Sequence, residues 1–285
     1  MELDQGLLFA LVGELLREDM GRGDLTTQSV MVASVNGRGR FLAKQDCIIC
    51  GIEAAEAVFA SLHAHLQLES FVTEGDEVKA GKEFARIEGP GDVLLTGERT
   101  ALNLIQHMSG IATLTRKYVD AIAGTNAKII DTRKTTPGLR FIDKYAVTVG
   151  GGVNHRFGLD DGILIKDNHI KLAGGIKEAV KRARQNVHHL LKIEVEVANF
   201  DQLREALATG VEVILLDNMT PEQIRQGVEI IRGEAGRNVI TEASGGINLE
   251  NVRQYAEAGA DLISVGAITH QATAIDISFK ITFAR

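Results

Sequence analysis

Apolar residues recur along the first part of the chain at two different spacings. Residues 5–18 carry leucine and valine at helical intervals, and residues 52–62 repeat that pattern. Shorter apolar runs beside turn residues predict strands, at 38–50, 66–71 and 83–87. A long helical pattern extends from about residue 94 to 123, and Ser109-Gly110 marks a point where it could break. These elements predict a mixed α/β lobe.

The rhythm changes at Ala127, where short apolar runs begin to alternate with helical patterns. The runs lie at 128–130, 146–149, 162–165, 192–197, 211–216, 238–241 and 261–265. Helical segments lie between most of them, at about 172–185, 200–208, 221–232 and 248–258. We therefore expect a parallel α/β barrel, incomplete and of about seven strands. A doubly wound open sheet is the alternative, and both place a ligand site at the carboxyl ends of the strands.

The composition is that of a globular protein and argues against several other classes. The 285 residues include 31 basic and 38 acidic side chains, for a net charge of −7, and aromatic residues are 5% without tryptophan. Such a chain is unsuited to binding nucleic acid. No apolar run reaches the roughly 18 residues of a membrane span. The start, Met-Glu-Leu-Asp-Gln, lacks the features of a signal peptide, so we expect a cytoplasmic protein.

The two cysteines, Cys47 and Cys50, form a lone Cys-x-x-Cys pair in an apolar run. A zinc site would need two more ligands nearby. We therefore expect two buried thiols in a strand.

A basic stretch follows the apolar run at 128–130. Between Thr132 and Gly158 the chain has one acid, Asp143, and five basic residues: Arg133, Lys134, Arg140, Lys144 and Arg156. A local basic excess in an acidic protein predicts a site for a small anion. Arginine can hold a carboxylate or phosphate by a two-pronged contact, and lysine adds a point charge.

Polar residues also recur where the later apolar runs end. They are Lys166-Asp167-Asn168, Glu194 and Glu196, Asp217-Asn218, Glu242 to Gly246, and Val265-Gly266-Ala267. A single acid at a strand end is often only a helix cap. Recurrence on one rim of a sheet is better explained by a shared binding site.

Several long motifs occur in an order that resembles one known family. They are Asp131-Thr132-Arg133-Lys134-Thr135-Thr136-Pro137-Gly138-Leu139-Arg140, Lys144 to Val147, Gly150 to Arg156, Leu164 to Ile170, Glu18 to Thr27 and Gly266 to His270. Over nearly the whole chain they resemble the quinolinate phosphoribosyltransferases (nicotinate-nucleotide pyrophosphorylases), type II phosphoribosyltransferases. Sets of long motifs are far more specific than a short pattern. The resemblance implies an α/β fold with an N-terminal α/β sandwich lobe at 1–115, onto which 272–285 packs back, and a barrel catalytic domain at 116–271.

The resemblance also implies a reaction. Quinolinate and 5-phosphoribosyl 1-pyrophosphate (PRPP) would give nicotinate mononucleotide, pyrophosphate and carbon dioxide, in NAD biosynthesis. Both substrates need cations and oriented N–H groups rather than a protein nucleophile. The residues that match the family's dicarboxylate site are Arg133, Lys134, His155, Arg156 and Lys166, with Thr132 beside them.

Arg99 is a candidate site residue on the strength of the resemblance alone. From spacing, it would be a solvated helix residue. In the family pattern this arginine reaches into the neighbouring subunit's site, which implies a homodimer. Whether dimers would assemble further stays open.

Glu196 and Asp217 stand one β-α-β step apart, on neighbouring expected strands. Two carboxylates that converge there can hold Mg²⁺, directly or through water, together with the pyrophosphate substrate. They could also face a ribose hydroxyl or stabilise positive charge at the anomeric carbon. Glu194 has the same orientation two residues deeper, but Glu196 fits the family motif and lies nearer the strand end. Together with Lys134 and Lys166, we expect Glu196 and Asp217 to be the catalytic residues.

The last two expected strands end in glycine-rich turns. Barrels commonly bind a phosphate on such turns through backbone N–H groups. We therefore expect phosphate contacts from Ser244, Gly245, Gly246, Val265, Gly266 and Ala267, and the family match adds His270.

The sequence leaves three other functions open. A pyrophosphorylase-like protein of molybdenum transport operons shares the expected fold, although the intact motifs at 133–140 and 154–156 argue against it. A barrel aldolase could use Lys134 or Lys166 as a Schiff base, which borohydride trapping would detect. A non-catalytic sensor of phosphorylated sugars would not need the acids and the whole basic set.

Overall fold

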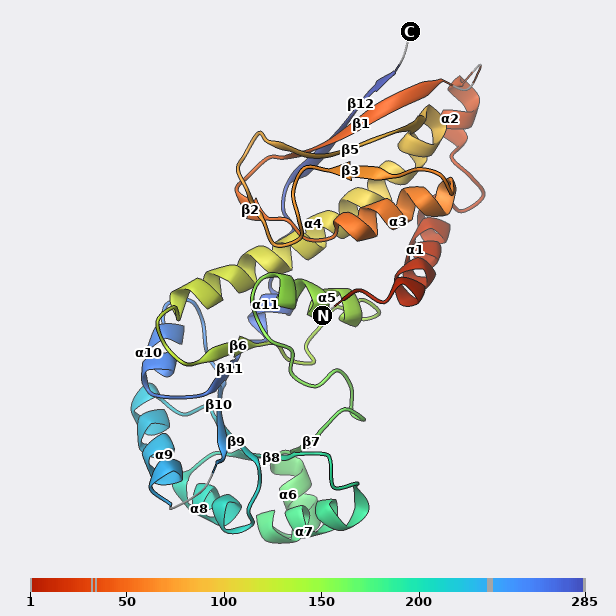
Figure 1. The fold of residues 1–285 in the computed structure, drawn as a ribbon. Coiled ribbons are helices and arrows are strands. Elements are labelled where there is room, and N and C mark those ends of the chain that lie inside the picture. Colours follow the sequence, from red (N-terminus) through yellow and green to blue (C-terminus); the bar gives the residue numbers. More distant parts are fainter. Residues whose placement is uncertain (1, 32, 34, 235–237, 284–285) are drawn as a thin grey trace. The chain divides into compact units, whose positions relative to one another are not determined.

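The computed structural model describes residues 2–31, 33, 35–234 and 238–283, and the chain divides into two compact units. The first unit comprises Met1–Arg116, Ile142–Gly151 and Ala272–Arg285, and the second comprises Lys117–Phe141 and Gly152–Gln271. Each unit has its own sheet (Figure 1). No helix in the described part of the chain combines the length and the apolar character needed to cross a membrane.

The first unit is built on a four-stranded antiparallel sheet in the order β12-β1-β5-β3 (Figure 1). Its strands are β1 (Asn36–Ala43), β3 (Leu68–Ser70), β5 (Glu83–Pro90) and β12 (Ile277–Phe283). β2 (Cys47–Ile48) and β4 (Glu77–Val78) form a separate pair. The helices are α1 (Gln5–Met20), α2 (Leu25–Val30), α3 (Ile52–Leu62) and the first part of α4 (Gly91–Ala121). The last strand of the chain thus forms one edge of the sheet, beside β1.

Four phenylalanines form the centre of this unit. Phe41 lies 4.6 Å from Phe279, 6.0 Å from Phe84 and 6.4 Å from Phe59, measured between ring centroids. The rings of Phe41, Phe59 and Phe84 are fully buried. Gly39 makes room for this cluster, since a Cβ there would lie 1.9 Å from Cζ of Phe279.

Helix α4 continues through Ser109-Gly110, so the break that this pair could have marked does not occur. Small residues are needed at Ser109 and Gly110 because other segments of the first unit pack closely against the helix here. A Cβ on Gly110 would lie 2.4 Å from the carbonyl oxygen of Thr273. The buried Ser109 hydroxyl accepts a hydrogen bond from the backbone N–H of Cys50 and donates one to its carbonyl, both at 3.0 Å.

Both cysteines are free and buried, as expected. Cys47 begins β2, whereas Cys50 lies just beyond it. Burial raises the pKa of the Cys47 thiol to about 11 and raises that of Cys50 as well. Both thiols therefore stay protonated and act as small apolar side chains.

The second unit contains, among its described residues, a six-stranded parallel sheet in the order β6-β11-β10-β9-β8-β7. The strands are β6 (Lys128–Ile130), β7 (Ile163–Ile165), β8 (Ile193–Val197), β9 (Val213–Asp217), β10 (Ile240–Ser244) and β11 (Leu262–Ser264). The helices are α6 (Asp167–Ala173), α7 (Ile176–Asn186), α8 (Phe200–Ala208), α9 (Pro221–Gly233), α10 (Val252–Glu257) and α11 (Ala267–His270). Helices α7 to α10 lie along the outside of the curved sheet (Figure 1). This is an open α/β barrel.

One of the seven expected strands is wrong. The run 146–149 belongs to a helix, α5 (Arg140–Val149), in which Ala146 and Val147 are fully buried. A short apolar run fits a buried helix as well as a strand, because its length gives no periodicity to choose between them. Beside β6, Val153 instead forms an isolated parallel bridge with Ile130. The barrel thus has six strands in the described residues and stays open.

The phenylalanine cluster gives a test of what stabilises the first unit. We expect Phe41→Ala to lower its free energy of unfolding by about 3–5 kcal/mol, because it removes a fully buried ring and leaves a cavity. Urea unfolding followed by circular dichroism measures this. Phe9→Ala is the control, since Phe9 on α1 is 45% exposed and should cost about 0.5 kcal/mol or less. Equal losses in the two variants would contradict the assignment of the core.

Candidate active site

The carboxyl ends of the strands in the second unit surround a pocket of about 810 Å³. Every site residue that we expected in this unit lines it: Thr132, Arg133, Lys134, His155, Arg156, Lys166, Glu196, Asp217, Ser244, Gly245, Gly246, Val265, Gly266, Ala267 and His270. Arg99 belongs to the first unit, where it is exposed on α4.

The register of the parallel sheet explains why these residues meet. Glu196 on β8 pairs with Leu215 on β9, and Asp217, two residues further along β9, pairs with Ser244 on β10. Successive side chains of a strand point to opposite faces, so Glu196, Asp217 and Ser244 project from the same face. Lys166 directly follows β7 and joins them at the same rim.

The loop after β6 brings in two cations of the basic stretch. Thr132 accepts a hydrogen bond on its Oγ1 from the backbone N–H of Lys134, at 3.0 Å. Arg140 ties this loop to the next one, since its guanidinium donates to Thr135 Oγ1 at 3.1 Å and to the Phe157 carbonyl at 3.0 Å. Arg140 therefore braces the loops that carry Arg133 and Arg156. Lys144, the remaining cation, is fully buried in the first unit.

Arg133 and Arg156 lie near enough to repel each other. Burial, and then the charge of Arg133, lower the pKa of Arg156. An arginine remains charged nonetheless, so the repulsion persists until an anion neutralises it. Arg156 is also held in place, because its Nη1 donates to the Gly162 carbonyl at 2.8 Å. The two arginines thus form a preorganised site for a negatively charged ligand.

Two glycine turns form another wall of the pocket. Gly245 has a φ of +96°, and a Cβ there would lie 2.2 Å from Oδ1 of Asn218, so only glycine fits. Asn218 is the one non-glycine residue in the described ranges with a positive φ, 54°, and its N–H donates to the Ser244 carbonyl at 2.8 Å. These contacts fix the backbone of the turn after β10.

The second turn, after β11, lies against the Lys134 loop. A Cβ on Gly266 would lie 3.1 Å from Cδ of Lys134 and 3.2 Å from Nε2 of His270. The Thr269 hydroxyl donates to the Lys134 carbonyl at 2.7 Å. A glycine backbone flanked by a lysine and a histidine is suited to an oxyanion such as a phosphate.

Glu196 and Asp217 repel each other. Burial raises the pKa of Glu196, and the negative charge of Asp217 raises it further, while Lys166 opposes the change. Two carboxylates in this relation are hard oxygen ligands that a divalent cation would stabilise.

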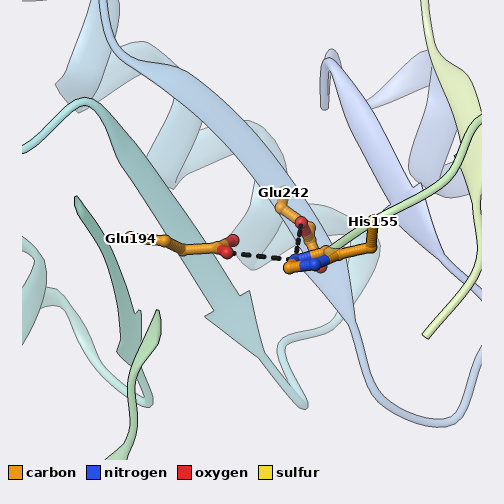
Figure 2. A group of neighbouring side chains, drawn as sticks. All are labelled: His155, Glu194 and Glu242. Atoms are coloured by element: carbon orange, nitrogen blue, oxygen red, sulfur yellow. Dashed lines mark hydrogen bonds and ion pairs between the residues drawn. The ribbon is translucent and has the colours of Figure 1, made fainter. Parts of the chain in front are cut away.

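Below the rim lies a cluster that our sequence analysis did not assign. Glu194 on β8 and Glu242 on β10 point toward the ring of His155, which comes from the loop before β7 (Figure 2). Oε2 of Glu194 is 3.0 Å from Nε2 of His155, and Oε2 of Glu242 is 3.6 Å from it. The residues are 6% and 1% exposed, respectively. Burial raises the pKa of both carboxyl groups, and the charge of Glu194 raises that of Glu242 further, so the pair retains a proton.

The hydrogen bonds of His155 determine what this cluster can hold. Nδ1 accepts the backbone N–H of Arg156 at 2.7 Å, so the ring proton of the neutral histidine is on Nε2 and faces Glu194. A metal-bound histidine normally donates through its other nitrogen, and here that nitrogen accepts. The three side chains have spacings that a metal ion could use, but the histidine is in the wrong tautomer. We conclude that the cluster holds protons rather than a metal.

Other residues of the pocket wall had no role assigned from the sequence. They are Tyr118, Leu164, Leu215, Asn218, Glu242, Ile247, Asn248, Ser264 and Gln271. Glu242 carried a usable signal, since it belongs to the same series of strand-end polar residues as Glu196 and Asp217. Tyr118 lies on a helix far from the rim in sequence, and no pattern pointed to it.

Comparison with known proteins places the chain in one family. Residues 111–280 match the family model "Quinolinate phosphoribosyl transferase, C-terminal domain", and residues 24–109 match the model of the N-terminal domain. The probable nicotinate-nucleotide pyrophosphorylase [carboxylating] of Bacillus subtilis (strain 168) is 44% identical over 274 residues, which is 96% of this chain and 93% of that protein.

Solved structures agree over the whole chain. The crystal structure of NadC from Streptococcus pyogenes superposes with a TM-score of 0.93 at 37% identity, covering 99% of this chain and 100% of that one. The nicotinate-nucleotide pyrophosphorylase from Francisella tularensis has a TM-score of 0.93 at 39% identity, covering 99% and 98%. The chain therefore belongs to the quinolinate phosphoribosyltransferase family, the decarboxylating pentosyltransferases of NAD biosynthesis that are also named nicotinate-nucleotide pyrophosphorylases.

Proposed function

We propose that the pocket at the strand ends converts quinolinate and PRPP to nicotinate mononucleotide, pyrophosphate and carbon dioxide. The observation that carries this proposal is the gathering of two unlike sets of groups around one cavity. One set is cationic and suits a small dicarboxylate, and the other is glycine-rich and suits phosphates. We also propose that 116–271 is the catalytic domain, and that 1–115 with 272–285 forms the supporting lobe.

The cationic set binds quinolinate. Arg133 and Arg156 take its carboxylates by paired N–H donors, and Lys166 adds a point charge at the rim. Lys134, Thr132 and His155 complete this side of the pocket. The mutual repulsion of the arginines supports the assignment, because a doubly charged ligand relieves it more than a singly charged one.

The glycine turns bind the phosphates of PRPP. Backbone N–H groups of 244–246 and of Gly266 and Ala267 approach the oxyanions closely, since Gly246 opens onto free space and Gly266 carries no side chain. The N–H of Val265 is already donated to the Ile130 carbonyl at 3.0 Å, so this residue shapes the turn. His270 and Lys134 flank the second turn and supply donors or charge.

Mg²⁺ would enter with PRPP. Glu196 and Asp217 fit such an ion. Burial and then the charge of Asp217 raise the pKa of Glu196, and a cation held directly or through water would stabilise both carboxylates. When bound, Mg²⁺ neutralises the charge on the departing pyrophosphate. Facing the ribose, the same carboxylates stabilise positive charge that develops at the anomeric carbon.

The reaction needs position and charge more than a nucleophilic side chain. The pyridine nitrogen forms a bond to the anomeric carbon as the bond to pyrophosphate breaks, and the electron pair of that bond leaves with pyrophosphate. The pyridinium ring then stabilises the carbanion that remains when the C2 carboxylate leaves as carbon dioxide. A proton completes nicotinate mononucleotide, and Lys134 and Lys166 are our candidates for assisting its delivery.

We further propose a homodimer in which Arg99 of each subunit serves the partner's pocket. Arg99 is exposed on α4, which supports this, because a side chain that reaches a partner's pocket must extend from the surface of its own subunit. The protein would work in the cytoplasm, and its two free thiols suit a reducing compartment.

A direct assay tests the reaction. With quinolinate, PRPP and Mg²⁺ we expect pyrophosphate and carbon dioxide in equal amounts, and chelation of Mg²⁺ should stop both. Nicotinate in place of quinolinate is the control, because a single carboxylate cannot satisfy both arginines. Equal turnover of nicotinate, or no product from quinolinate, would refute the proposed function.

Arg133→Ala tests the dicarboxylate clamp. Losing a charge-assisted contact costs about 2–5 kcal/mol, so kcat/KM should fall by about 30-fold or more while the circular dichroism spectrum stays unchanged. Arg204→Ala is the matched control, since Arg204 on α8 is exposed and makes only a surface ion pair with Asp201. Near-normal pyrophosphate release by the Arg133 variant would remove the clamp from the mechanism.

Mixed dimers test the shared site. Arg99→Ala and Lys166→Ala should each be inactive alone, because each lacks a cation at every pocket. After unfolding and refolding together in a 1:1 ratio, about a quarter of wild-type activity should return, since about half of the dimers are then mixed and one of the two pockets in each mixed dimer has both cations. No recovery in a mixture that gel filtration shows to be dimeric would exclude donation across the interface.

A further inference from the structure

Glu242 is an unusual residue to find beneath an anion-binding pocket. It is 1% exposed, and its Oε2 accepts no hydrogen bond from the residues that the structure describes. Burying a carboxyl group is costly unless something compensates for it. Nε2 of His155 lies 3.6 Å from this oxygen, while the side chains of Ser264 and Glu194 form hydrogen bonds with the carboxyl group. The carboxyl oxygen that accepts no hydrogen bond therefore faces the histidine ring.

Three polar atoms of His155 are already used within the protein. Its backbone N–H donates to Oδ1 of Asp131 at 2.8 Å, and its Nδ1 accepts from Arg156 at 2.7 Å. Its Nε2 donates to Glu194 at 3.0 Å. Both ring nitrogens are therefore engaged with protein groups, so this ring connects β8 to the loop that carries Arg156. Glu242 of β10 lies beside the same ring (Figure 2).

The connection ends at Arg156. The backbone N–H of Arg156 is held by the histidine ring, and the guanidinium is held by the carbonyl of Gly162 at 2.8 Å. If the ring turned, the first of these bonds would be lost and the guanidinium would move with its backbone. The carboxyl group of Glu242 packs against the ring and limits that rotation by contact, without a short hydrogen bond to the ring.

We propose that Glu242 is a positioning residue: by holding the His155 ring, it fixes the loop that presents Arg156 to the dicarboxylate. This inference rests on the proposed function, because it assigns Arg156 to quinolinate. It also gives His155 a different task, since the ring acts by orienting Arg156. In this role the shape and polarity of the Glu242 side chain hold the ring and its charge is not needed, so a neutral side chain of the same shape should replace it.

Kinetics of Glu242 variants test the proposal with PRPP and quinolinate varied in turn. Glu242→Leu should raise KM for quinolinate by about 10–100-fold, the usual cost of losing a partner behind a binding residue. The KM for PRPP should stay within about twofold, because the glycine turns do not depend on His155. Glu242→Gln keeps the shape and a polar end, so it should restore most of the affinity for quinolinate.

Thr241→Val is the matched control for damage to β10. Thr241 is the neighbouring residue, is fully buried, and donates to Asp261 at 2.7 Å on the other face of the strand. This variant should lose stability while both KM values stay within about twofold of wild type. A quinolinate defect in Thr241→Val as large as that of Glu242→Leu would overturn the proposal.

Two further outcomes would overturn it. One is an equal rise of both KM values in Glu242→Leu, and the other is a glutamine variant as defective as the leucine variant.

If Glu242→Leu does not fold, His155→Phe tests the same link, because it keeps the ring shape and removes both nitrogens. This variant should show the same selective rise in KM for quinolinate. Normal KM for quinolinate in His155→Phe would refute the connection. Wild-type protein that does not turn over quinolinate would refute the proposed function itself, whereas active wild type with unaffected Glu242 variants refutes only this inference.

Discussion

The site depends on one constraint, the register of the parallel sheet. Parallel strands end at a common rim, and alternate residues of each strand point to a common face. Glu196, Asp217 and Ser244 meet for this reason, although they are far apart in sequence. Loops from the same rim then add Arg133, Lys134 and Arg156. The fold thus concentrates charge at one place before any ligand is present.

That concentration is unfavourable for the protein alone. Burial and then the charge of Arg133 lower the pKa of Arg156, and burial and then the charge of Asp217 raise the pKa of Glu196, so like charges oppose each other on both sides of the pocket. The conflict is relieved by ligands of the opposite sign: a dicarboxylate on one side and a cation on the other. Strain of this kind is typical of sites whose substrates carry several charges, and it explains why the surrounding scaffold must be rigid. Arg140, Thr269 and the turn at Gly245 supply that rigidity through bonds between loops.

Beneath the charged rim, the structure keeps acids where they would be least expected. Glu194 and Glu242 are buried beside His155, and the pair retains a proton because burial disfavours two charges there. Their effect on the pocket passes through the histidine to the backbone of Arg156. Residues behind a binding arginine can in this way decide how well that arginine is oriented.

The sequence by itself determined the family, the alternation of strands and helices after Ala127, and the charged residues that line the pocket, except Glu242. These are recoverable because a motif or a strand end is a local property of the chain. Only the tertiary structure decided that 146–149 is helical, since a short buried run has the same pattern in both states. It also decided that Arg140 braces loops, that Lys144 is buried, and that Glu242 joins Glu194 at His155. These outcomes depend on which distant segments of the chain pack together. Burial and strand register decide this, and neither can be read from the residues next to one another in the sequence.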